Sequence, residues 1–285
     1  MHTASSPSIA RMKKIKFKSF SSGSCGNCYF LGVFSEEDAC LGGILLDAGV
    51  SPRRLKKELA AEGLGFDDFS AILITHDHLD HIRSLGSYCK HVGKPVWTSG
   101  KLFNALSRHF MTGEYLGSFR NELSGGWTEV VPGLIRVRPF EVPHDATQTV
   151  GFAIYADGHL YVHITDCGRM TDEALEWCGK ADTIVLESNY DPRMLENGPY
   201  PEELQERIRG GHGHMSNEEC SEALRASMHD GLSNIFLCHL SEHNNTPRLA
   251  LDCARKALPG FARIVPLPRQ TPSPMFELRN SQKIL

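Results

Sequence analysis

Three histidines and two aspartates lie within six consecutive residues of this chain. They form the run His76-Asp77-His78-Leu79-Asp80-His81, directly after the apolar stretch 71–75. A buried core could not hold so many polar side chains, because most of them would lack hydrogen-bond partners. Imidazole and carboxylate groups are common ligands of zinc, iron and manganese. The run therefore predicts a metal site, and a surface histidine cluster without metal is the alternative.

Further candidate ligands stand where other strands are expected to end. His144 follows the stretch 134–142, Asp166 follows 160–165, and His239 follows 235–238. Each of these residues alone would be an ordinary polar strand end. Together with the histidine run they predict a shared site, because the ends of strands in a rigid sheet present side chains to a cleft. There are then enough ligands for two metal ions.

The elements that must position these ligands are mostly strands, with helices between them. Alternation and apolar runs predict strands at 14–20, 43–47, 71–75, 95–98, 134–142, 150–155, 160–165, 183–187 and 235–239. Helices are expected at 52–61, 102–110, 172–178, 201–209, 217–229 and 247–257. A glycine-rich turn is expected at 21–27, and Asp157-Gly158 predicts a hairpin. No linker interrupts the pattern, which favours one α/β (α+β) domain over 14–285 after a disordered tail at 1–13.

The overall composition excludes several classes of protein. With 41% hydrophobic residues in 285, the chain can bury a large core, and a net charge of −4 provides no global basic field for nucleic acid. Nine cysteines without repeated spacing do not form a disulfide framework, so a reducing cytoplasm is expected. Cys25 and Cys28 have the spacing of a zinc or redox pair, but no second pair accompanies them, and small residues in a tight loop are the preferred interpretation. No apolar stretch approaches the roughly 20 residues needed to cross a bilayer.

The run is similar to the His-x-His-x-Asp-His signature of the metallo-β-lactamase superfamily, and the resemblance extends from residue 22 to about 245. It implies an αββα sandwich of two mixed sheets flanked by helices, with a binuclear metal site between the sheets. The implied ligands are His76, His78 and His144 for the first metal, Asp80, His81 and His239 for the second, and Asp166 as the bridge. The cofactors would be two divalent ions, namely zinc, with manganese or iron as alternatives. Asp47 is interpreted as a support for a ligating histidine.

Such a site implies hydrolysis. Two cations with only two ligand carboxylates keep net positive charge, which lowers the pKa of a bridging water and makes hydroxide the nucleophile. The same charge stabilises an anionic substrate, which favours a phosphoester. Asp80 is counted among the catalytic residues as well as among the ligands.

Two residues beyond the ligand set are candidates for catalysis. The segment 186–191, followed by 213–217 before a helix, resembles the nuclease branch of the superfamily that includes transfer-RNA 3′-processing enzymes. This resemblance implies that His214 is a general acid for the leaving group and that Glu187 orients it. The alternative is that His214 belongs only to the cap of the following helix.

The segments 22–27, 46–49, 213–217 and 239–245 together resemble the YycJ/WalJ-like family. The resemblance implies a 5′-to-3′ exonuclease acting on duplex DNA, with substrate contacts at Ser24, Asn27, Asn244 and Asn245. Clustered cations could bind phosphates; they are Lys14, Lys16, Lys18, Arg53, Arg54, Lys56 and Lys57. The preferred interpretation is a solvated surface, on an edge strand for the three lysines and on a helix for the other four residues. A thioester or lactone hydrolase of the glyoxalase type is the rival function, and a non-enzymatic binding module is a third.

Overall fold

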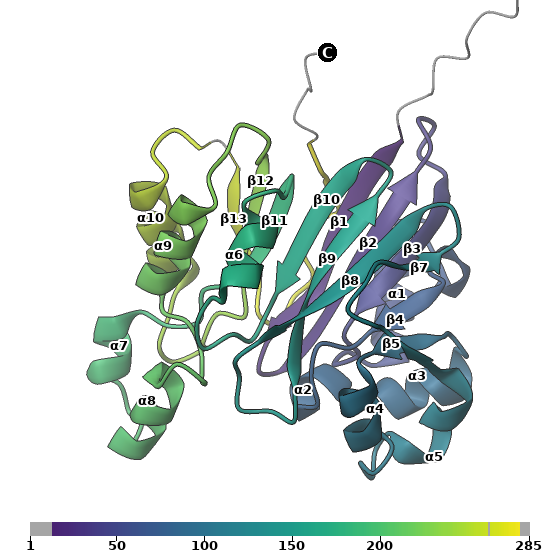
Figure 1. The fold of residues 1–285 in the computed structure, drawn as a ribbon, viewed down its shortest axis with the longest axis horizontal. Coiled ribbons are helices and arrows are strands. Elements are labelled where there is room, and N and C mark those ends of the chain that lie inside the picture. The colour runs from purple at the N-terminus through teal and green to yellow at the C-terminus, as the bar shows by residue number, and fades with distance from the viewer. Residues whose placement is uncertain (1–12, 262, 280–285) are drawn as a thin grey trace, which may run out of the picture.

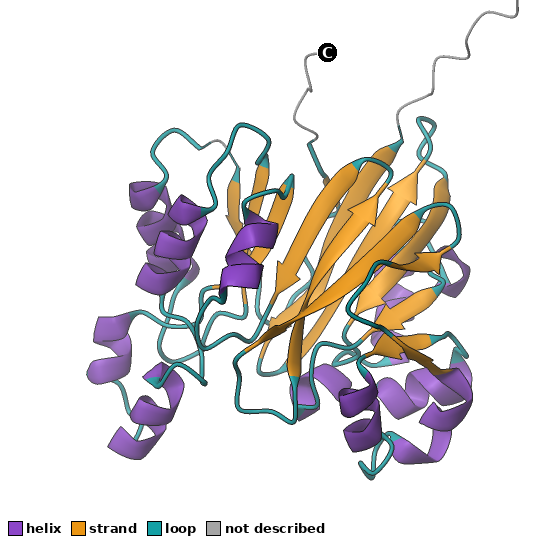
Figure 2. Cartoon of the chain, in the orientation of Figure 1, coloured by secondary structure: helices purple, strands orange, loops and turns teal. Residues whose placement is uncertain are grey.

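Two seven-stranded sheets pack face to face in this computed structural model, and helices cover both outer faces (Figure 1). The structure describes residues 13–261 and 263–279. Residues 1–12 of the expected tail lie outside the described part. Figure 2 shows the strands as a central double layer between two groups of helices. The predicted αββα sandwich is therefore confirmed.

The first sheet carries the histidine run. Its strands, in spatial order, are β14 (Phe276–Glu277), β1 (Lys14–Gly23), β2 (Gly26–Phe34), β3 (Cys40–Leu46), β4 (Ala71–Leu73), β5 (Val96–Thr98) and β6 (Arg120–Glu122). Strands β3 to β6 are parallel, whereas β2 is antiparallel to both β1 and β3, and β1 is antiparallel to β14. The carboxyl ends of β3 and β4 consequently meet at one edge of the sheet.

The second sheet carries the remaining expected ligands. Its order is β13 (Ile264–Pro266), β12 (Asn234–Cys238), β11 (Thr183–Glu187), β10 (His159–Ile164), β9 (Thr149–Ala156), β8 (Ile135–Val142) and β7 (Thr128–Val131). Strands β10 to β13 are parallel, and β8 shares their direction because β9 is antiparallel to both β8 and β10. The ends of β8, β10, β11 and β12 therefore lie along one edge.

Helices cover each sheet from outside. The first sheet is flanked by α1 (Pro52–Ala60), α3 (Leu85–His91), α4 (Gly100–Leu106) and α5 (Gly113–Leu116), and α2 (Leu79–Ile82) contains part of the histidine run. The second is flanked by α6 (Asp172–Cys178), α9 (Asn217–Ala226) and α10 (Pro247–Ala257). The short helices α7 (Pro192–Glu196) and α8 (Glu202–Arg209) lie beyond its lower edge in Figure 1. None of these described helices is long and apolar enough to cross a membrane.

Three apolar layers hold the sandwich together. One lies between the two sheets and includes Phe17, Tyr29, Phe152 and Phe236, all fully buried. The other two join each sheet to its helices. Burial of this apolar surface is the main favourable term in folding, and it fixes both sheets so that their ligand-bearing edges face each other.

Most expected strands and helices are present, with several differences. The helix expected at 102–110 begins at Gly100 and ends at Leu106, because the hydroxyl of Thr112 donates to the Leu106 carbonyl that a longer helix would use. The expected turn at 21–27 is tighter: only Ser24 and Cys25 separate β1 from β2. The Asp157-Gly158 hairpin is confirmed, and both residues have positive φ, 47° and 88°.

Strand β1 is not the solvated edge strand that its lysines suggested. It lies between β14 and β2, and Lys18 is 4% exposed. The Lys18 ammonium pairs with Glu62, while Lys14 and Lys16 both pair with Asp38. These lysines already have carboxylate partners, which weakens their expected role as phosphate contacts.

Candidate metal centre

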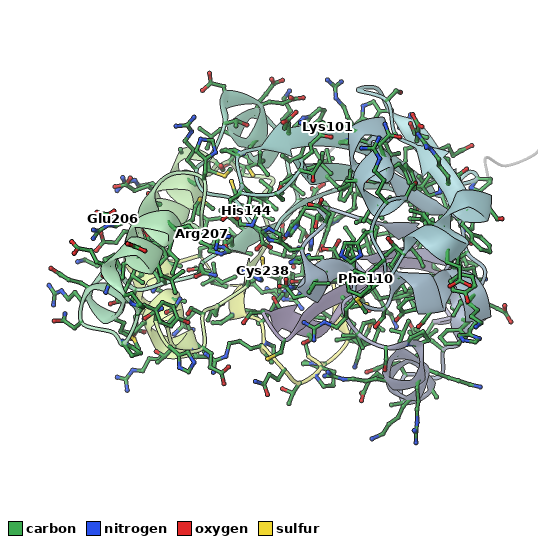
Figure 3. All side chains as sticks on the ribbon, turned by 90° about the horizontal axis from the view of Figure 1, so that it is seen from below. Lys101, Phe110, His144, Glu206, Arg207 and Cys238 are labelled. Carbon is green, nitrogen blue, oxygen red and sulfur yellow. The ribbon has the colours of Figure 1, made fainter. Side chains whose placement is uncertain are left out.

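Every expected ligand lies at a strand end or in α2, on facing edges of the two sheets. His76 and His78 follow β4, Asp80 and His81 lie in α2, His144 follows β8, Asp166 follows β10, and His239 follows β12. The first four come from the first sheet and the other three from the second. Figure 3, a view from below, shows His144 near the middle of this face.

The donor atoms gather into two groups, and Asp166 lies close to histidines of both. One nitrogen each of His76, His78 and His144 lies within 4.8 Å of the others. The same holds for Asp80, His81 and His239, and a third group joins His76 and His81 to Asp166. A fourth group consists of Asp166, Glu187, His214 and His239. The structure thus brings all the expected ligands together, and their division between two metals stays a prediction.

Asp47 fixes two of the histidine rings, directly or through Thr75, at the ring nitrogen that faces away from the centre. The His81 Nδ1–H donates to the Asp47 carboxylate at 2.7 Å. The Thr75 hydroxyl also donates to Asp47, at 2.9 Å, so it can only accept at the His76 Nδ1, 3.0 Å away. In the neutral form both rings therefore carry their proton on Nδ1 and turn Nε2 inward. Fixing a ring in this way is how outer groups prepare a histidine for a metal.

Three further histidines are also fixed by a polar partner at one ring nitrogen. The His144 Nδ1 donates to the carbonyl of Gly213 at 2.6 Å, and the His239 Nδ1 lies 3.1 Å from Glu187. For His78 the roles of the nitrogens reverse: its Nε2 faces the Asp145 carbonyl at 3.2 Å, which leaves Nδ1 near the Nε2 of His144. One ring nitrogen of each histidine is thus available to a metal ion.

The buried groups at the centre fit a divalent cation. His76 Nε2 is buried and has no hydrogen-bond partner among the described residues. A buried polar atom left unpaired costs about 1–3 kcal/mol. Asp166 stands in the middle, with carboxylate oxygens 3.1 Å from His81 Nε2 and 3.7 Å from His144 Nε2. Imidazole and carboxylate donors together are those of zinc, manganese and iron sites.

The electrostatic environment keeps His76 and Asp166 in the form a metal requires. At His81 and His239 the effect of burial is outweighed by nearby carboxylates, which raise the pKa of each ring, so a metal ion would have to displace a proton from each. Burial holds the pKa of His76 well below its usual value, so this ring is neutral. Burial opposes ionisation of Asp166, but the surrounding histidines outweigh it and hold its pKa well below the usual range. A neutral imidazole and an ionised carboxylate are the ligating forms of these side chains.

His214 faces the same centre without belonging to the expected ligand set. Its Nδ1 lies 2.7 Å from Glu187 Oε1, and its side chain keeps 22% exposure while Glu187 is fully buried. The following helix is capped by Ser216 and Glu219, so His214 is not the capping residue. Burial alone would lower the pKa of His214, but the Glu187 carboxylate outweighs it and raises this pKa. A protonated His214 beside the centre can supply a proton.

The expected substrate contacts are only partly placed at the site. Ser24 is exposed and lines the cavity beside the centre. Asn27 is fully buried and its amide faces Asp80 and His81, at 3.0 and 2.8 Å. The Asn245 amide donates to two carbonyls and to Asn217, so it ties loops together. Asn244 is also buried, 1% exposed. The structure thus gives the three asparagines no surface for substrate.

Sequence reasoning missed the groups that hold the ligands. Thr75 links Asp47 to His76, Gly213 supplies the carbonyl for His144, and Asn189 donates to the His239 carbonyl at 2.8 Å. Each lies within or beside a motif already singled out. Their roles depend on contacts between distant segments, for which a single sequence has no signal. Thr75 was the easiest of these residues to find from the sequence, since a hydroxyl directly before a ligand run is a common orienting group.

Comparison with known proteins agrees with the fold. The model of the Beta-lactamase superfamily domain matches residues 43–233. The solved structure of the metallo-β-lactamase fold protein YhfI from Bacillus subtilis aligns with a TM-score of 0.65 and 15% identity, covering 92% of this chain and 99% of that one. The chain is thus a metal-dependent hydrolase of the metallo-β-lactamase superfamily.

Two relatives narrow this class. Exodeoxyribonuclease WalJ of Streptococcus pneumoniae is 31% identical over 235 residues, which cover 82% of this chain and 85% of the relative. Exodeoxyribonuclease YycJ of Bacillus anthracis is 32% identical over 236 residues, 83% of this chain and 86% of that protein. The chain belongs to the WalJ/YycJ family.

Proposed function

We propose that this protein is a binuclear metal-dependent phosphodiesterase that degrades duplex DNA from 5′ ends. The observation that carries the proposal is the His214–Glu187 pair at 2.7 Å beside the ligand cluster. A proton donor separate from the ligands suits a reaction with a poor leaving group, such as the alkoxide of a phosphodiester. The exodeoxyribonuclease names of WalJ and YycJ support DNA as the substrate.

The residues divide the chemistry among them. Bound divalent ions supply a nucleophile of lowered pKa and positive charge for the substrate phosphate. We propose that His76, His78 and His144 hold one ion, that Asp80, His81 and His239 hold the other, and that Asp166 bridges them. His214 then gives its proton to the departing 3′ oxygen, and Glu187 keeps the ring oriented and charged. Zinc is the proposed metal, and a cytoplasmic location is supported by nine free cysteines.

The first experiment measures metal content and turnover together. Purified protein should bind two equivalents of zinc or manganese by elemental analysis, hydrolyse bis(p-nitrophenyl) phosphate, and shorten the 3′-labelled strand of a 5′-phosphorylated DNA duplex. Chelator should abolish both activities and metal should restore them. Bound metal with turnover of S-lactoylglutathione but of neither phosphodiester would replace this function with the thioester hydrolase. Bound metal with no turnover at all would indicate a binding module.

A further inference from the structure

A cavity of about 270 Å³ opens beside the metal centre and has two chemically different walls. One wall consists of His78, His214 and His239. A second wall comes from the segment around α8 and consists of Tyr200, Leu204, Arg207 and Ile208. No sequence motif pointed to this second wall. The cavity is therefore continuous with the proposed reaction site but extends well beyond it.

Helix α8 shows its apolar side to this cavity instead of to the core. It contains no buried residue, although Leu204 and Ile208 are spaced to share one face. Both residues are half-buried and line the cavity, and so does Tyr200 just before the helix. An apolar and aromatic surface of this kind suits the flat face of a nucleobase.

The end of α8 is fixed directly to the catalytic segment. The His214 amide donates to the Ile208 carbonyl at 2.8 Å. At Gly213 a side chain would meet the carbonyl oxygens of Arg207 and Ile208 at 2.2 and 2.3 Å, so the two segments pack too closely for any residue but glycine. The position of Arg207 relative to the proposed general acid is consequently set by backbone contacts.

Arg207 brings a positive charge to the rim of the cavity. Its side chain is 64% exposed, and its guanidinium pairs with Asp145. Asp145 in turn reaches the ligand histidines, with Oδ1 3.4 Å from His144 Nε2 and 3.8 Å from His78 Nε2. The Asp145 carboxylate therefore links Arg207 to two of the proposed metal ligands. A planar guanidinium recognises carboxylate and phosphate with the same geometry, so a substrate phosphate can take the place of Asp145.

We propose that this cavity binds one nucleotide of the DNA end, with Arg207 holding a phosphate next to the scissile one and Tyr200 and Leu204 contacting the base. This proposal rests on the nuclease function and names the residues that select its substrate. The volume is a little below the 300–1,000 Å³ common for ligand pockets, which suits a single nucleotide. The strand end would then have to leave the duplex before cleavage.

Calorimetry with deoxycytidine 5′-monophosphate and with deoxycytidine tests the cavity directly, in protein with chelator and in protein loaded with zinc. The wild type should bind the nucleotide more tightly than the nucleoside. Arg207→Ala should weaken nucleotide binding by about 10- to 100-fold, as expected for a charge-assisted hydrogen bond, and leave nucleoside binding nearly unchanged. Tyr200→Ala should weaken both ligands by roughly fivefold or more, and Tyr200→Phe should restore them.

Arg209→Ala is the matched control, since Arg209 is an exposed arginine at the end of the same helix that does not line the cavity. It should bind both ligands as the wild type does. If Arg207→Ala also binds them unchanged, or if the wild type binds neither ligand, the cavity proposal is overturned. Circular dichroism of each variant confirms that it is folded.

DNA degradation separates this proposal from the function on which it rests. Arg207→Ala should raise KM for duplex DNA more than it lowers kcat. A rise confined to 5′-phosphorylated ends identifies the terminal phosphate, and an equal rise on 5′-hydroxyl ends identifies an internal one. Arg207-dependent nucleotide binding without any DNA degradation by the wild type would reject the nuclease and keep the cavity. DNA degradation by the wild type, with KM unchanged in Arg207→Ala, would reject the cavity proposal and keep the nuclease.

Discussion

Asp47 is the residue on which the histidine run most depends. It holds His81 directly and His76 through the Thr75 hydroxyl, so one buried carboxylate sets the direction of two proposed ligands. Its own backbone has φ of +60°, a conformation that aspartate tolerates better than most residues. The sequence predicted Asp47 as a support for one histidine, and the structure extends that interpretation to two.

Asp47→Asn should lower metal affinity by about 10- to 100-fold, the usual loss when such a support is removed. The amide can still accept one hydrogen bond, but it loses the negative charge that favours a proton on His81 Nδ1. Competition with a fluorescent zinc chelator measures the change. Asp67→Asn, at a fully exposed aspartate, is the control. Equal zinc affinity in both variants would contradict the role given to Asp47.

His214→Ala should reduce kcat on DNA by about 10²- to 10⁴-fold, the range for loss of a positioned general acid, with metal content unchanged. His212→Ala, at an exposed histidine two residues earlier, should retain activity. Bis(p-nitrophenyl) phosphate has a good leaving group and needs the proton less, so its turnover should fall less than that of DNA. Equal losses on both substrates would remove His214 from the role of proton donor.

The pH profile tests the Glu187 partner. Because Glu187 raises the pKa of His214, the acid form persists to higher pH, and activity is lost as the pH rises through that pKa. Glu187→Gln removes the raising charge, so the alkaline limb of the kcat profile should move to lower pH. A limb that stays in place, or moves to higher pH, would show that another group titrates there. Glu187 also contacts His239, so metal content must be verified for this variant.

At the scale of elements, prediction from sequence succeeded where local signals agreed. The bounds of β11, α6 and α10 match the expected ranges, because β-branched or helix-forming residues stand between clear caps such as Thr171 and Thr246. Strand β2 was missed entirely. All nine of its residues are buried, so it lacks the alternation that marks a strand with one solvated face. The ligands themselves were found because His and Asp recur at strand ends.

Gly49 is the position where two elements of the site approach each other most closely. A Cβ atom there would lie 1.8 Å from the backbone carbonyl oxygen of Asp80 in α2 and 2.4 Å from the backbone nitrogen of Asn27 in β2. Gly49→Ala should therefore push α2 away, lower the thermal midpoint and reduce zinc binding. Gly117→Ala, at a glycine with nothing within 4 Å, should do neither. A Gly49→Ala protein with normal stability and zinc affinity would show that α2 can shift without loss.

At the scale of the whole molecule, the metal centre joins the two sheets. The first sheet contributes His76, His78, Asp80 and His81, and the second contributes His144, Asp166 and His239. The apolar layer between the sheets continues to the ligand-bearing edge, which supports the proposal that the described residues from 14 to 279 act as one domain. Residues 262 and 280–285 of the expected domain lie outside the described part. A bound cation would therefore stabilise the contact between the sheets as well as the catalytic geometry.

Metal should consequently raise the stability of the whole fold. At free zinc of about 1,000 times Kd, linkage predicts a gain of about 4 kcal/mol, which corresponds to roughly 7 °C in thermal midpoint for a chain of this size. Scanning calorimetry with zinc and with chelator measures the shift. The gain should disappear in His76→Ala, which removes a ligand of the first sheet, and persist in His212→Ala. An equal midpoint with and without zinc in the wild type would mean that the sheets hold the same geometry unaided, and the centre would then serve the reaction alone.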